Sequence, residues 1–291
     1  MNPPQNHDLS GKTCLITGSS RGIGYETAVS LARMGAHMII VSHNLERSKA
    51  AHQRIINEFG EQAAHYYVAN LSVQDQIHQL ADGILRDYDR LDVLVNNVGG
   101  WYRNFKQSAD GIEMTLAVNH LSYFLLTGRL LPLLEKSTPA RIINVSSDAH
   151  RQVSGIRFDD LQFQQRYRAF AVYAHSKLAN IMFTYELDRR LNGSGITVNT
   201  LHPGFVKSEL YRHFGIATPI VNLAAGVFGK NAEQGAETSI YLASSPDVAD
   251  ISGKYFADRK PQESSPASYD EAEAKRLWAV SEELTGFIYP I

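Results

Sequence analysis

Short, continuously apolar runs alternate with longer helical patterns along most of this chain, and no other feature restricts its fold as much. Such runs are typical of strands buried on both faces of a parallel sheet. The predicted strands cover residues 13–17, 37–41, 65–69, 92–95, 141–145, 196–200 and 254–256. Because parallel strands need crossover connections, the helices between them lie on both faces of the sheet. The pattern predicts an α/β, doubly wound Rossmann fold with a mainly parallel, seven-stranded sheet.

The same pattern indicates a single domain spanning residues 1–291. The chain has no Pro-, Gly- or Ser-rich linker in its middle and no internal repeat. The predicted helices cover 23–34, 45–58, 74–87, 111–134, 168–191 and 232–242. Residues 259–291 are interpreted as a polar C-terminal extension that ends in a helix over 270–283.

The composition excludes several classes of protein. Hydrophobic residues make up 44% and charged residues 20% of the 291 residues, which is ordinary globular usage. The formal net charge is −2 and the basic residues are scattered, so we expect no nucleic-acid partner. The single cysteine, Cys14, excludes a disulfide framework, and the histidines lack metal-site spacing. With no apolar run long enough for a transmembrane segment and no signal peptide, we expect a cytoplasmic protein without a metal.

A glycine-rich turn follows the first predicted strand and opens a helix. It runs Thr17-Gly18-Ser19-Ser20-Arg21-Gly22-Ile23-Gly24, with the spacing G-x-x-x-G-x-G. Gly18 permits a tight turn, Gly22 lets the backbone approach a pyrophosphate, and Gly24 lets the helix pack closely on the sheet. The helix N-terminus presents unpaired N–H groups to the anion. A merely glycine-rich turn is the alternative, but the position after the first strand favours a nucleotide.

The end of the second predicted strand bears on which dinucleotide is bound. An NAD site has an acidic residue there, which accepts a hydrogen bond from the ribose 2′-hydroxyl. Here Ser42 and His43 occupy that place, and Arg21 and Arg47 are close in sequence. A carboxylate would repel a 2′-phosphate, whereas cations and a hydroxyl would hold it. The sequence therefore predicts NADP(H); the alternative is that both arginines are solvated surface charges.

Tyr173 and Lys177 lie four residues apart at the start of a helical pattern, so both side chains lie on one helix face. A nearby cation favours the phenolate and lowers the pKa of a tyrosine from its usual value near ~10. Such a pair arises easily by chance. However, Ser147 and Asn97 each follow a predicted strand at the carboxyl edge of the sheet, and a predicted helix carries Asn119. Together these residues predict a carbonyl site beside the glycine loop.

A hydrolase is the rival interpretation of the same region. Ser147, Asp148 and His150 lie close in sequence and contain the residue types of a nucleophilic triad. However, no G-x-S-x-G turn surrounds Ser147, which makes this interpretation poor.

With these motifs in order, the sequence resembles the short-chain dehydrogenase/reductase family, and within it the retinol dehydrogenase-like branch. The resemblance extends from about residue 9 to about residue 286. Its motifs are Thr17-Gly18-x-x-x-Gly22-x-Gly24, Asn70-Leu71-Ser72, Asn96-Asn97-Val98-Gly99, Asn119, Ser146-Ser147, Tyr173-x-x-x-Lys177 and His202-Pro203-Gly204-Phe205-Val206. Asn70, Val98 and His43 depart from the family's usual Asp, Ala and Arg at these places.

The resemblance implies a role for each matched residue. Tyr173 would be the acid–base residue, Lys177 would lower its pKa and bind the nicotinamide ribose, and Ser147 would polarise the carbonyl. Asn119 would hold a water that links Lys177 to solvent. The other implied cofactor contacts are Asn70 and Leu71 at the adenine, Asn97 and Gly99 at the adenosine ribose, Val118 beside Asn119, Pro203, Gly204 and Val206 at the nicotinamide, and Ser208 at the carboxamide.

Residues 208–232 are predicted to form a lid over the substrate. The segment is too apolar for a free surface loop and too broken for a regular core helix. In the family this region covers the substrate, so an apolar lid implies a hydrophobic carbonyl or alcohol such as a retinoid, aldehyde, steroid or xenobiotic ketone. A subunit contact or a membrane-surface patch is the alternative. Trp101, Tyr102 and Phe105 are expected to extend the same wall.

We therefore expect an oxidoreductase that transfers a hydride between NADP(H) and the carbonyl or alcohol of a hydrophobic small molecule. Tyr173 would give or take the proton. The alternatives are a non-catalytic NADP(H)-sensing or scaffold protein and a reductase of an activated C=C bond. By analogy with the family, we expect a homodimer.

Overall fold

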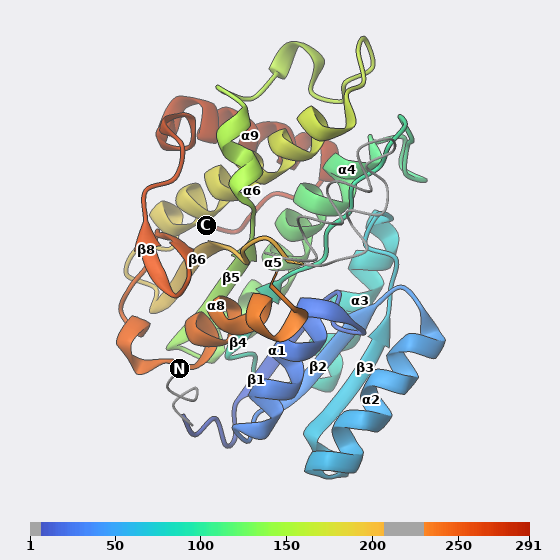
Figure 1. Cartoon of the computed structure of the whole chain (residues 1–291), viewed down its shortest axis with the longest axis vertical. Helices are drawn as coiled ribbons and strands as arrows, with labels where there is room; N and C mark the ends of the chain where they lie inside the picture. The colour runs from blue at the N-terminus through green and yellow to red at the C-terminus, as the bar shows by residue number, and fades with distance from the viewer. Residues whose placement is uncertain (1–6, 207–229) are drawn as a thin grey trace.

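The computed structural model describes residues 7–206 and 230–291 (Figure 1). The strands are β1 (Thr13–Thr17), β2 (His37–Ser42), β3 (Ala64–Val68), β4 (Val93–Asn96), β5 (Ala140–Val145), β6 (Ile196–His202), β7 (Tyr255–Ala257) and β8 (Lys260–Gln262). The α-helices are α1 (Gly22–Arg33), α2 (Leu45–Phe59), α3 (Gln74–Asp87), α4 (Met114–Leu116), α5 (Ser122–Lys136), α6 (Ala169–Arg190), α8 (Ala232–Ser244) and α9 (Glu271–Thr285). A π-helix, η2 (Ala117–Leu121), joins α4 to α5, and the 3₁₀ turns are η1 (Glu61–Ala63), η3 (Asp148–Gln152), η4 (Phe158–Asp160), η7 (Pro246–Val248) and η8 (Pro266–Tyr269).

The strands of the described residues form one sheet in the order β3-β2-β1-β4-β5-β6-β7-β8. Strands β1 to β7 are all parallel to one another. The direction in which the chain adds strands reverses between β1 and β4, and in sheets of this kind ligands bind outside the carboxyl ends of the strands at that point. The α/β doubly wound fold predicted from the sequence is confirmed.

The sheet has one strand more than the seven predicted. β8 pairs antiparallel with β7 across a turn in which Asp258 and Arg259 have φ angles of 50° and 61°. Its residues are all exposed, and they include Pro261, which an edge strand tolerates because no partner needs its missing N–H. Because β8 is short, polar and exposed, it carries no apolar run that could reveal it in the sequence.

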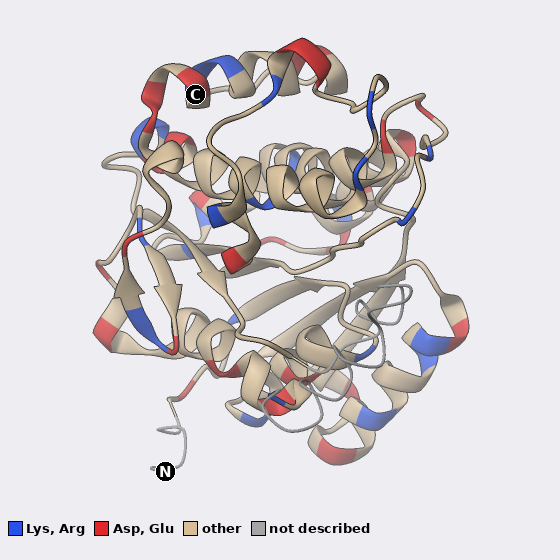
Figure 2. Ribbon diagram, turned by 45° about the horizontal axis from the view of Figure 1, so that its top comes forward, with Lys and Arg blue, Asp and Glu red and all other residues tan. Residues whose placement is uncertain are grey.

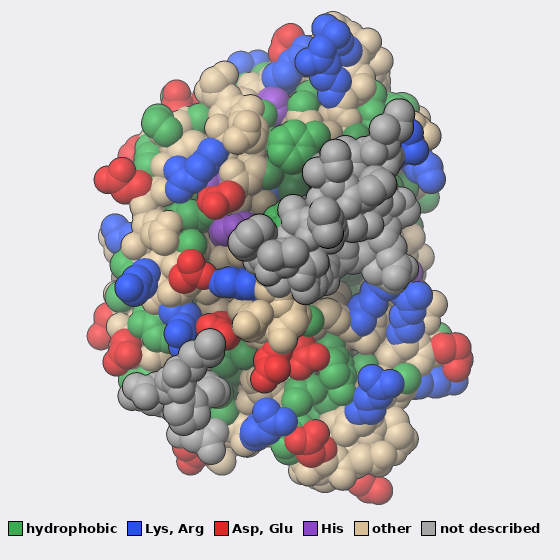
Figure 3. Space-filling model, viewed as in Figure 1, with side chains coloured by type: hydrophobic (Ala, Val, Ile, Leu, Met, Phe, Trp, Pro, Cys, Tyr) green, Lys and Arg blue, Asp and Glu red, His purple; other side chains and the backbone are tan. Residues whose placement is uncertain are grey.

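Two layers of helices cover the sheet (Figures 1 and 2). Side chains of α3, α5 and α6 form a buried cluster with one face, and those of α1, α2 and α8 form another with the opposite face. Cys14 of β1 is fully buried in the second cluster, as expected of a small core residue. Acidic and basic side chains of the described residues are interspersed on the face that Figure 3 shows.

The C-terminal helix α9 packs against α6 on the outside of the first layer (Figure 1). Leu277 of α9 joins Leu178 and Met182 of α6 in a small buried cluster. Trp278 is 3% exposed, and its ring lies 5.1 Å from that of Phe124 in α5. The C-terminal residues thus bury apolar surface against two helices of the main layer. Among the described residues, no helix is both long and apolar enough to cross a bilayer.

Candidate active site

The sequence motifs converge on the carboxyl edge of the sheet. Gly18 follows β1, Asn97 follows β4, Ser147 comes two residues after β5, and Pro203 follows β6. Because these four strands are parallel and adjacent, their carboxyl ends lie along the same edge. This edge is also the point where the strand order reverses, so the topology places the candidate site where open α/β sheets bind their ligands.

Three glycines shape the turn between β1 and α1. Gly18 and Gly22 have φ angles of 67° and 60°, which L side chains rarely adopt. A methyl group on Gly24 would lie 2.6 Å from the carbonyl oxygen of Gly18 and 2.6 Å from Nδ2 of Asn97. Gly24 is therefore needed for the close packing of α1 on the Gly18 turn and on Asn97 at the end of β4. Asn97 fixes the loop by donating a hydrogen bond from Nδ2 to the carbonyl of Thr17, at 2.8 Å.

The start of α1 has the properties of an anion site. Arg21 is the N-cap residue in an extended conformation, and its side chain makes no capping hydrogen bond to the helix. Among the described residues, no atom would lie within 4 Å of a Cβ atom on Gly22, so these residues leave the backbone at that glycine accessible to a ligand. Ser20 and Ile23 flank this turn and are half-buried. The open helix N-terminus fits the pyrophosphate of a dinucleotide.

The end of β2 carries no carboxylate at Ser42 or His43. Ser42 is 8% exposed, and its hydroxyl lies 2.7 Å from that of Ser48, so it is already engaged. His43 and Arg47 are exposed, as is Arg21 on the glycine loop. Of the residues expected to hold a 2′-phosphate, three are therefore exposed, and Ser42 is buried.

Asn70 and Leu71 follow β3 but present different atoms from those expected. The Oδ1 atom of Asn70 accepts hydrogen bonds from the backbone N and the hydroxyl of Ser72, at 3.1 and 2.9 Å. Leu71 is 5% exposed and belongs to the core. The predicted acceptor on Asn70 therefore closes a local turn, while Asn70 as a whole is exposed.

Lys177 is a buried cation at the centre of the site. It is 3% exposed, and Nζ donates a hydrogen bond to the carbonyl of Val145 at 3.0 Å. Nζ also lies 5.7 Å from the ring centre of Tyr173, and a methyl group on Gly99 would lie 3.5 Å from it. Burial lowers the pKa of Lys177 from 10.5 to about 7. The i, i+4 spacing thus brings the amine and the phenol ring together as predicted from the helical pattern.

Ser147 caps η3 immediately after β5 and is half-buried. Its Oγ atom accepts a hydrogen bond from the backbone N of Ala149 at 3.2 Å. Within the described part of the chain its own proton has no acceptor, so it can be donated to a substrate oxygen. The neighbouring Ser146 donates its hydroxyl proton to the carbonyl of Lys177 at 2.7 Å, which ties the end of β5 to α6.

Asn119 clamps the loop after β4 to α6. Its Oδ1 accepts from the N of Gly100 at 2.7 Å, and its Nδ2 donates to the Gly100 carbonyl at 3.0 Å and to the hydroxyl of Ser176 at 2.9 Å. Both amide protons of Asn119 are therefore used, whereas Oδ1 can accept one further hydrogen bond, for example from a water. Asn119 lies in the π-helix η2, an irregularity often found at functional sites. Val118, beside it, is buried.

The residues after β6 reach the same edge. Gly204 has a φ angle of 85°, and a methyl group on it would lie 2.8 Å from the side chain of Lys230. Val206 is 4% exposed and forms an isolated bridge with Lys230. Pro203 and Gly204 are half-buried at the position expected for nicotinamide contacts. Ser208 and most of the predicted lid, 208–232, lie outside the described residues.

The motifs do not reveal Tyr123, which also lies at this site. Its hydroxyl donates a hydrogen bond to the carbonyl of Val98 at 2.7 Å, and its ring centre is 6.0 Å from Nζ of Lys177. Burial raises the pKa of Tyr123 well above its usual value, so it remains a neutral donor. In the sequence it lies within a long apolar helical pattern and has no signal that separates it from the core.

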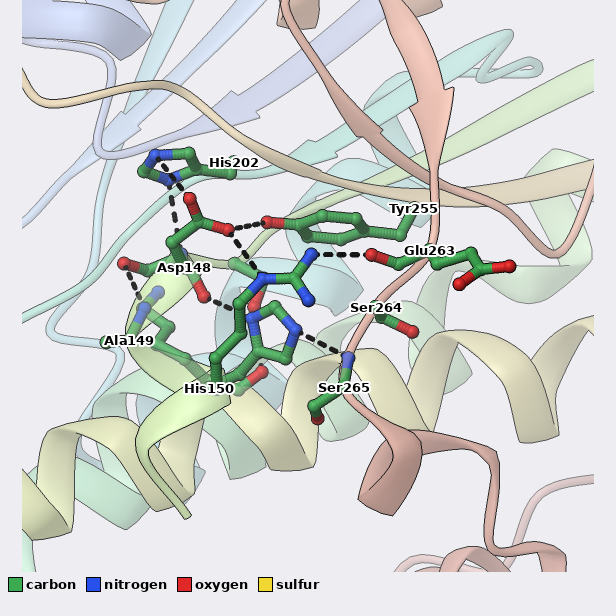
Figure 4. Close-up of polar contacts among 12 residues, drawn as sticks. Asp148, Ala149, His150, His202, Tyr255, Glu263, Ser264 and Ser265 are labelled. Carbon is green, nitrogen blue, oxygen red and sulfur yellow. Dashed lines mark hydrogen bonds and ion pairs between the residues drawn. The ribbon is translucent and has the colours of Figure 1, made fainter. Parts of the chain in front are cut away.

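The contacts around Ser147 argue against the triad interpretation (Figure 4). Nδ1 of His150 lies 2.7 Å from the carbonyl oxygen of Ser147, not from its hydroxyl, and the Nε2 atom accepts from the backbone N of Ser265 at 3.0 Å. Asp148 accepts a hydrogen bond from the hydroxyl of Tyr255 at 2.7 Å. Both imidazole nitrogens are engaged with backbone, so His150 cannot act as a base for the Ser147 hydroxyl. The described residues contain no group of three metal-ligating side chains.

Comparisons with known proteins agree with this geometry. Residues 12–216 match the sequence model of the family described as short chain dehydrogenase. The chain is 41% identical to human retinol dehydrogenase 14, over 96% of this chain and 88% of that protein. It is 42% identical to human retinol dehydrogenase 13, over 99% of this chain and 88% of that protein.

Solved structures show the same fold. An uncharacterised protein from Mycobacterium paratuberculosis superposes with a TM-score of 0.80 at 31% identity, covering 98% of this chain and 97% of that one. The NADP complex of Pseudomonas aeruginosa RhlG superposes with a TM-score of 0.70 at 29% identity, covering 86% of this chain and 95% of that one.

Proposed function

Because this chain belongs to the short chain dehydrogenase family, we propose that it transfers a hydride between NADP(H) and the carbonyl or alcohol of a hydrophobic substrate. The family and the relatives place it among the oxidoreductases that use a nicotinamide cofactor and act on CH–OH or C=O groups. One observation carries the proposal furthest: a buried lysine amine lies 5.7 Å from the ring centre of a half-buried tyrosine at the carboxyl edge of the sheet.

The proposed chemistry assigns one task to each side chain. A bound NADP(H) supplies or takes up the hydride. Tyr173 gives its phenolic proton to the substrate oxygen during reduction and takes it back during oxidation. Lys177 in its charged form stabilises the phenolate, because the low dielectric around a buried pair strengthens their attraction. Ser147 donates a hydrogen bond to the same substrate oxygen and stabilises the charge that develops on it.

The preference for NADP(H) rests on charge at the end of β2. The end of β2 carries His43 where a carboxylate would select NAD(H), and Arg21 of the glycine loop and Arg47 of α2 are exposed cations close to it in sequence. The RhlG relative was solved with NADP, as was a short chain dehydrogenase from Burkholderia cenocepacia at 25% identity and a TM-score of 0.69, covering 85% of this chain and 96% of that one. These complexes support the same cofactor here.

The hydrophobic substrate class is supported by exposed aromatic side chains on the segments that follow Asn97 and precede Tyr173. Phe105 is 38% exposed, and its ring lies 5.9 Å from that of Tyr167. Phe170 is 45% exposed and precedes Tyr173 by three residues on α6, so it lies on the same face of the helix. Exposure of large apolar side chains to water is unfavourable, so an apolar ligand that covers them is stabilised by the hydrophobic effect.

A carbonyl panel followed by NADPH absorbance tests the proposal. Retinal, long-chain aldehydes, steroid ketones and enones would each be offered with NADPH and with NADH. We expect carbonyl-dependent oxidation of NADPH, a fall in turnover of at least ~100-fold for Tyr173→Phe, and unchanged cofactor binding. Tyr241→Phe, on α8 in the opposite layer, is the matched control. NADPH oxidation with enones alone would favour a C=C reductase, and no oxidation with any compound would favour a cofactor-sensing protein.

A cytoplasmic location and a homodimer stay predictions. Any pairing of two copies through α5 and α6 would have to accommodate α9, which already packs on both helices.

A further inference from the structure

We propose that His150 is a positioning residue for Ser147, which it joins to the C-terminal segment at Ser265. The role rests on the proposed function, in which Ser147 polarises the substrate carbonyl. Ser265 and Tyr255, the residues that hold His150 in place, lie beyond the 12–216 region that matches the family. The C-terminal segment is therefore part of the active-site architecture of this chain.

The hydrogen bonds of His150 define its protonation state (Figure 4). A backbone N–H can only donate, so the contact between Ser265 N and Nε2 makes Nε2 an acceptor. The proton of the neutral ring is then on Nδ1, which donates to the carbonyl of Ser147 at 2.7 Å. Burial lowers the pKa of His150 below its usual value, which keeps this neutral tautomer. One ring thus joins the carbonyl of Ser147 to the backbone N–H of Ser265, which lies 115 residues after His150 in the chain.

The residues around the ring restrict its movement. His150 is 0% exposed, and its ring makes an edge-on contact of 5.1 Å with that of Tyr255. Asp148 accepts a hydrogen bond from Tyr255, and it lies 3.6 Å from Nε2 of His202. Arg151 donates to the backbone carbonyl of Glu263 at 2.5 Å. The turn η3 is therefore held from β6, from β7 and from the segment after β8.

The C-terminal segment also contacts the helix that carries the other half of the site. The hydroxyl of Ser264 lies 2.8 Å from that of Tyr185 on α6. Ser264 and Ser265 are 4% and 5% exposed, so these bonds are shielded from water. Since α6 carries Tyr173 and η3 follows Ser147, this segment links the two elements whose spacing decides whether both hydroxyls reach one substrate oxygen. A misplacement of about 1 Å in such an arrangement can cost about 100-fold in rate.

Three substitutions separate the two bonds of the ring. His150→Leu removes both, and we expect kcat to fall by about tenfold to 100-fold while the KM for NADPH hardly changes. His150→Asn places an amide N–H the same number of bonds from Cα as Nδ1, so it can keep the bond to Ser147 but not that to Ser265. His150→Gln places an acceptor at the position of Nε2, so it can keep only the bond to Ser265. If the bridge matters, both polar variants have a lower kcat than the wild type. If His150→Asn retains wild-type kcat, the link to Ser265 is dispensable and the proposal is wrong.

A double-mutant cycle distinguishes positioning from a general structural role. If His150 acts through Ser147, His150→Leu lowers kcat much less in a Ser147→Ala background than in the wild type. If the two losses multiply in full, the proposal is overturned. His52→Leu is the control, because His52 lies on α2 and the change removes an imidazole bond to the carbonyl of Ala64 at the start of β3. Should His150→Leu fail to fold, the same cycle is run with His150→Gln. A wild-type chain that turns over no carbonyl compound would refute the proposed function itself, and this role with it.

Discussion

Replacing Lys177 by methionine is expected to stabilise the cofactor-free protein at pH 7 while it abolishes turnover. Burial lowers the pKa of Lys177 from 10.5 to about 7. One pKa unit corresponds to about 1.4 kcal/mol, so keeping this ammonium charged in the folded state costs about 5 kcal/mol. Loss of the hydrogen bond from Lys177 to the Val145 carbonyl offsets about 1 kcal/mol of this gain. The Val145 carbonyl still accepts a long hydrogen bond from the Tyr123 hydroxyl, at 3.4 Å. Allowing for imperfect packing of the new side chain, we expect a net gain of about 2–4 kcal/mol.

The same burial predicts a pH dependence whose sign is opposite to that of an ion-paired lysine. A lysine with a lowered pKa binds fewer protons in the folded state, so the free energy of unfolding rises with pH between about 7 and 10.5. From pH 7 to pH 9 the expected rise is about 2 kcal/mol. Buried histidines change stability below this window, since burial lowers the pKa of His120 to about 4. Burial raises the pKa of the Cys14 thiol from 9.0, so Cys14 lowers stability as the pH rises above about 9.

Urea denaturation at pH 7, 8 and 9 measures this effect. We compare the wild type with Lys177→Met and with Lys254→Met, a control at an exposed lysine. The wild type and the control should gain stability with pH, whereas Lys177→Met should start higher and stay flat. A Lys177→Met protein that is less stable than the wild type at pH 7, together with a flat wild-type profile, would refute the reasoning from burial.

Two further substitutions test the cofactor site. Gly24→Ala brings a methyl group 2.6 Å from the Gly18 carbonyl, so we expect a loss of about 1–3 kcal/mol in stability and at least a tenfold weaker binding of NADPH in a fluorescence titration. Gly83→Ala, on α3, is its control, and unchanged NADPH affinity in Gly24→Ala would show that the loop tolerates the methyl group. Arg47→Glu should raise the KM for NADPH about tenfold or more and leave that for NADH unchanged, because the lost contact is to the 2′-phosphate. Arg54→Glu on the same helix is the control, and an equal effect on both cofactors would contradict a 2′-phosphate contact.

Much of the fold and part of the site could be predicted from local sequence patterns. The apolar runs located β1 to β7 to within a few residues because strands buried on both faces need apolar side chains throughout. The spacing of Tyr173 and Lys177 predicted their proximity because both lie on one helix, whose geometry is local. The helix predicted over 111–134 was too simple. It starts at Met114, after Glu113 caps its first turn, and contains the π-helix that carries Asn119.

The contacts that the sequence did not predict are mostly made with residues far away in the chain. Tyr123 contacts Val98 and Lys177 across the site. In the sequence it lies in an apolar stretch, where a tyrosine cannot be distinguished from a core residue. The sequence places His150 near Ser147 and Asp148, as in a nucleophilic triad. Only the tertiary structure shows that both ring nitrogens of His150 contact backbone groups, those of Ser147 and Ser265. Asn70 and Asn119 also make side-chain hydrogen bonds, to Ser72 and to Ser176, that the sequence did not predict.

The sequence alone determined the order of strands and helices, the glycine turn and the helical tyrosine–lysine pair, because each depends on residues within a few positions of one another. Tertiary structure decided which strand ends became neighbours, how deeply Lys177 is buried and what holds the turn after Ser147. Those properties depend on contacts between residues that are far apart in the chain, and periodicity and spacing carry no information about such contacts.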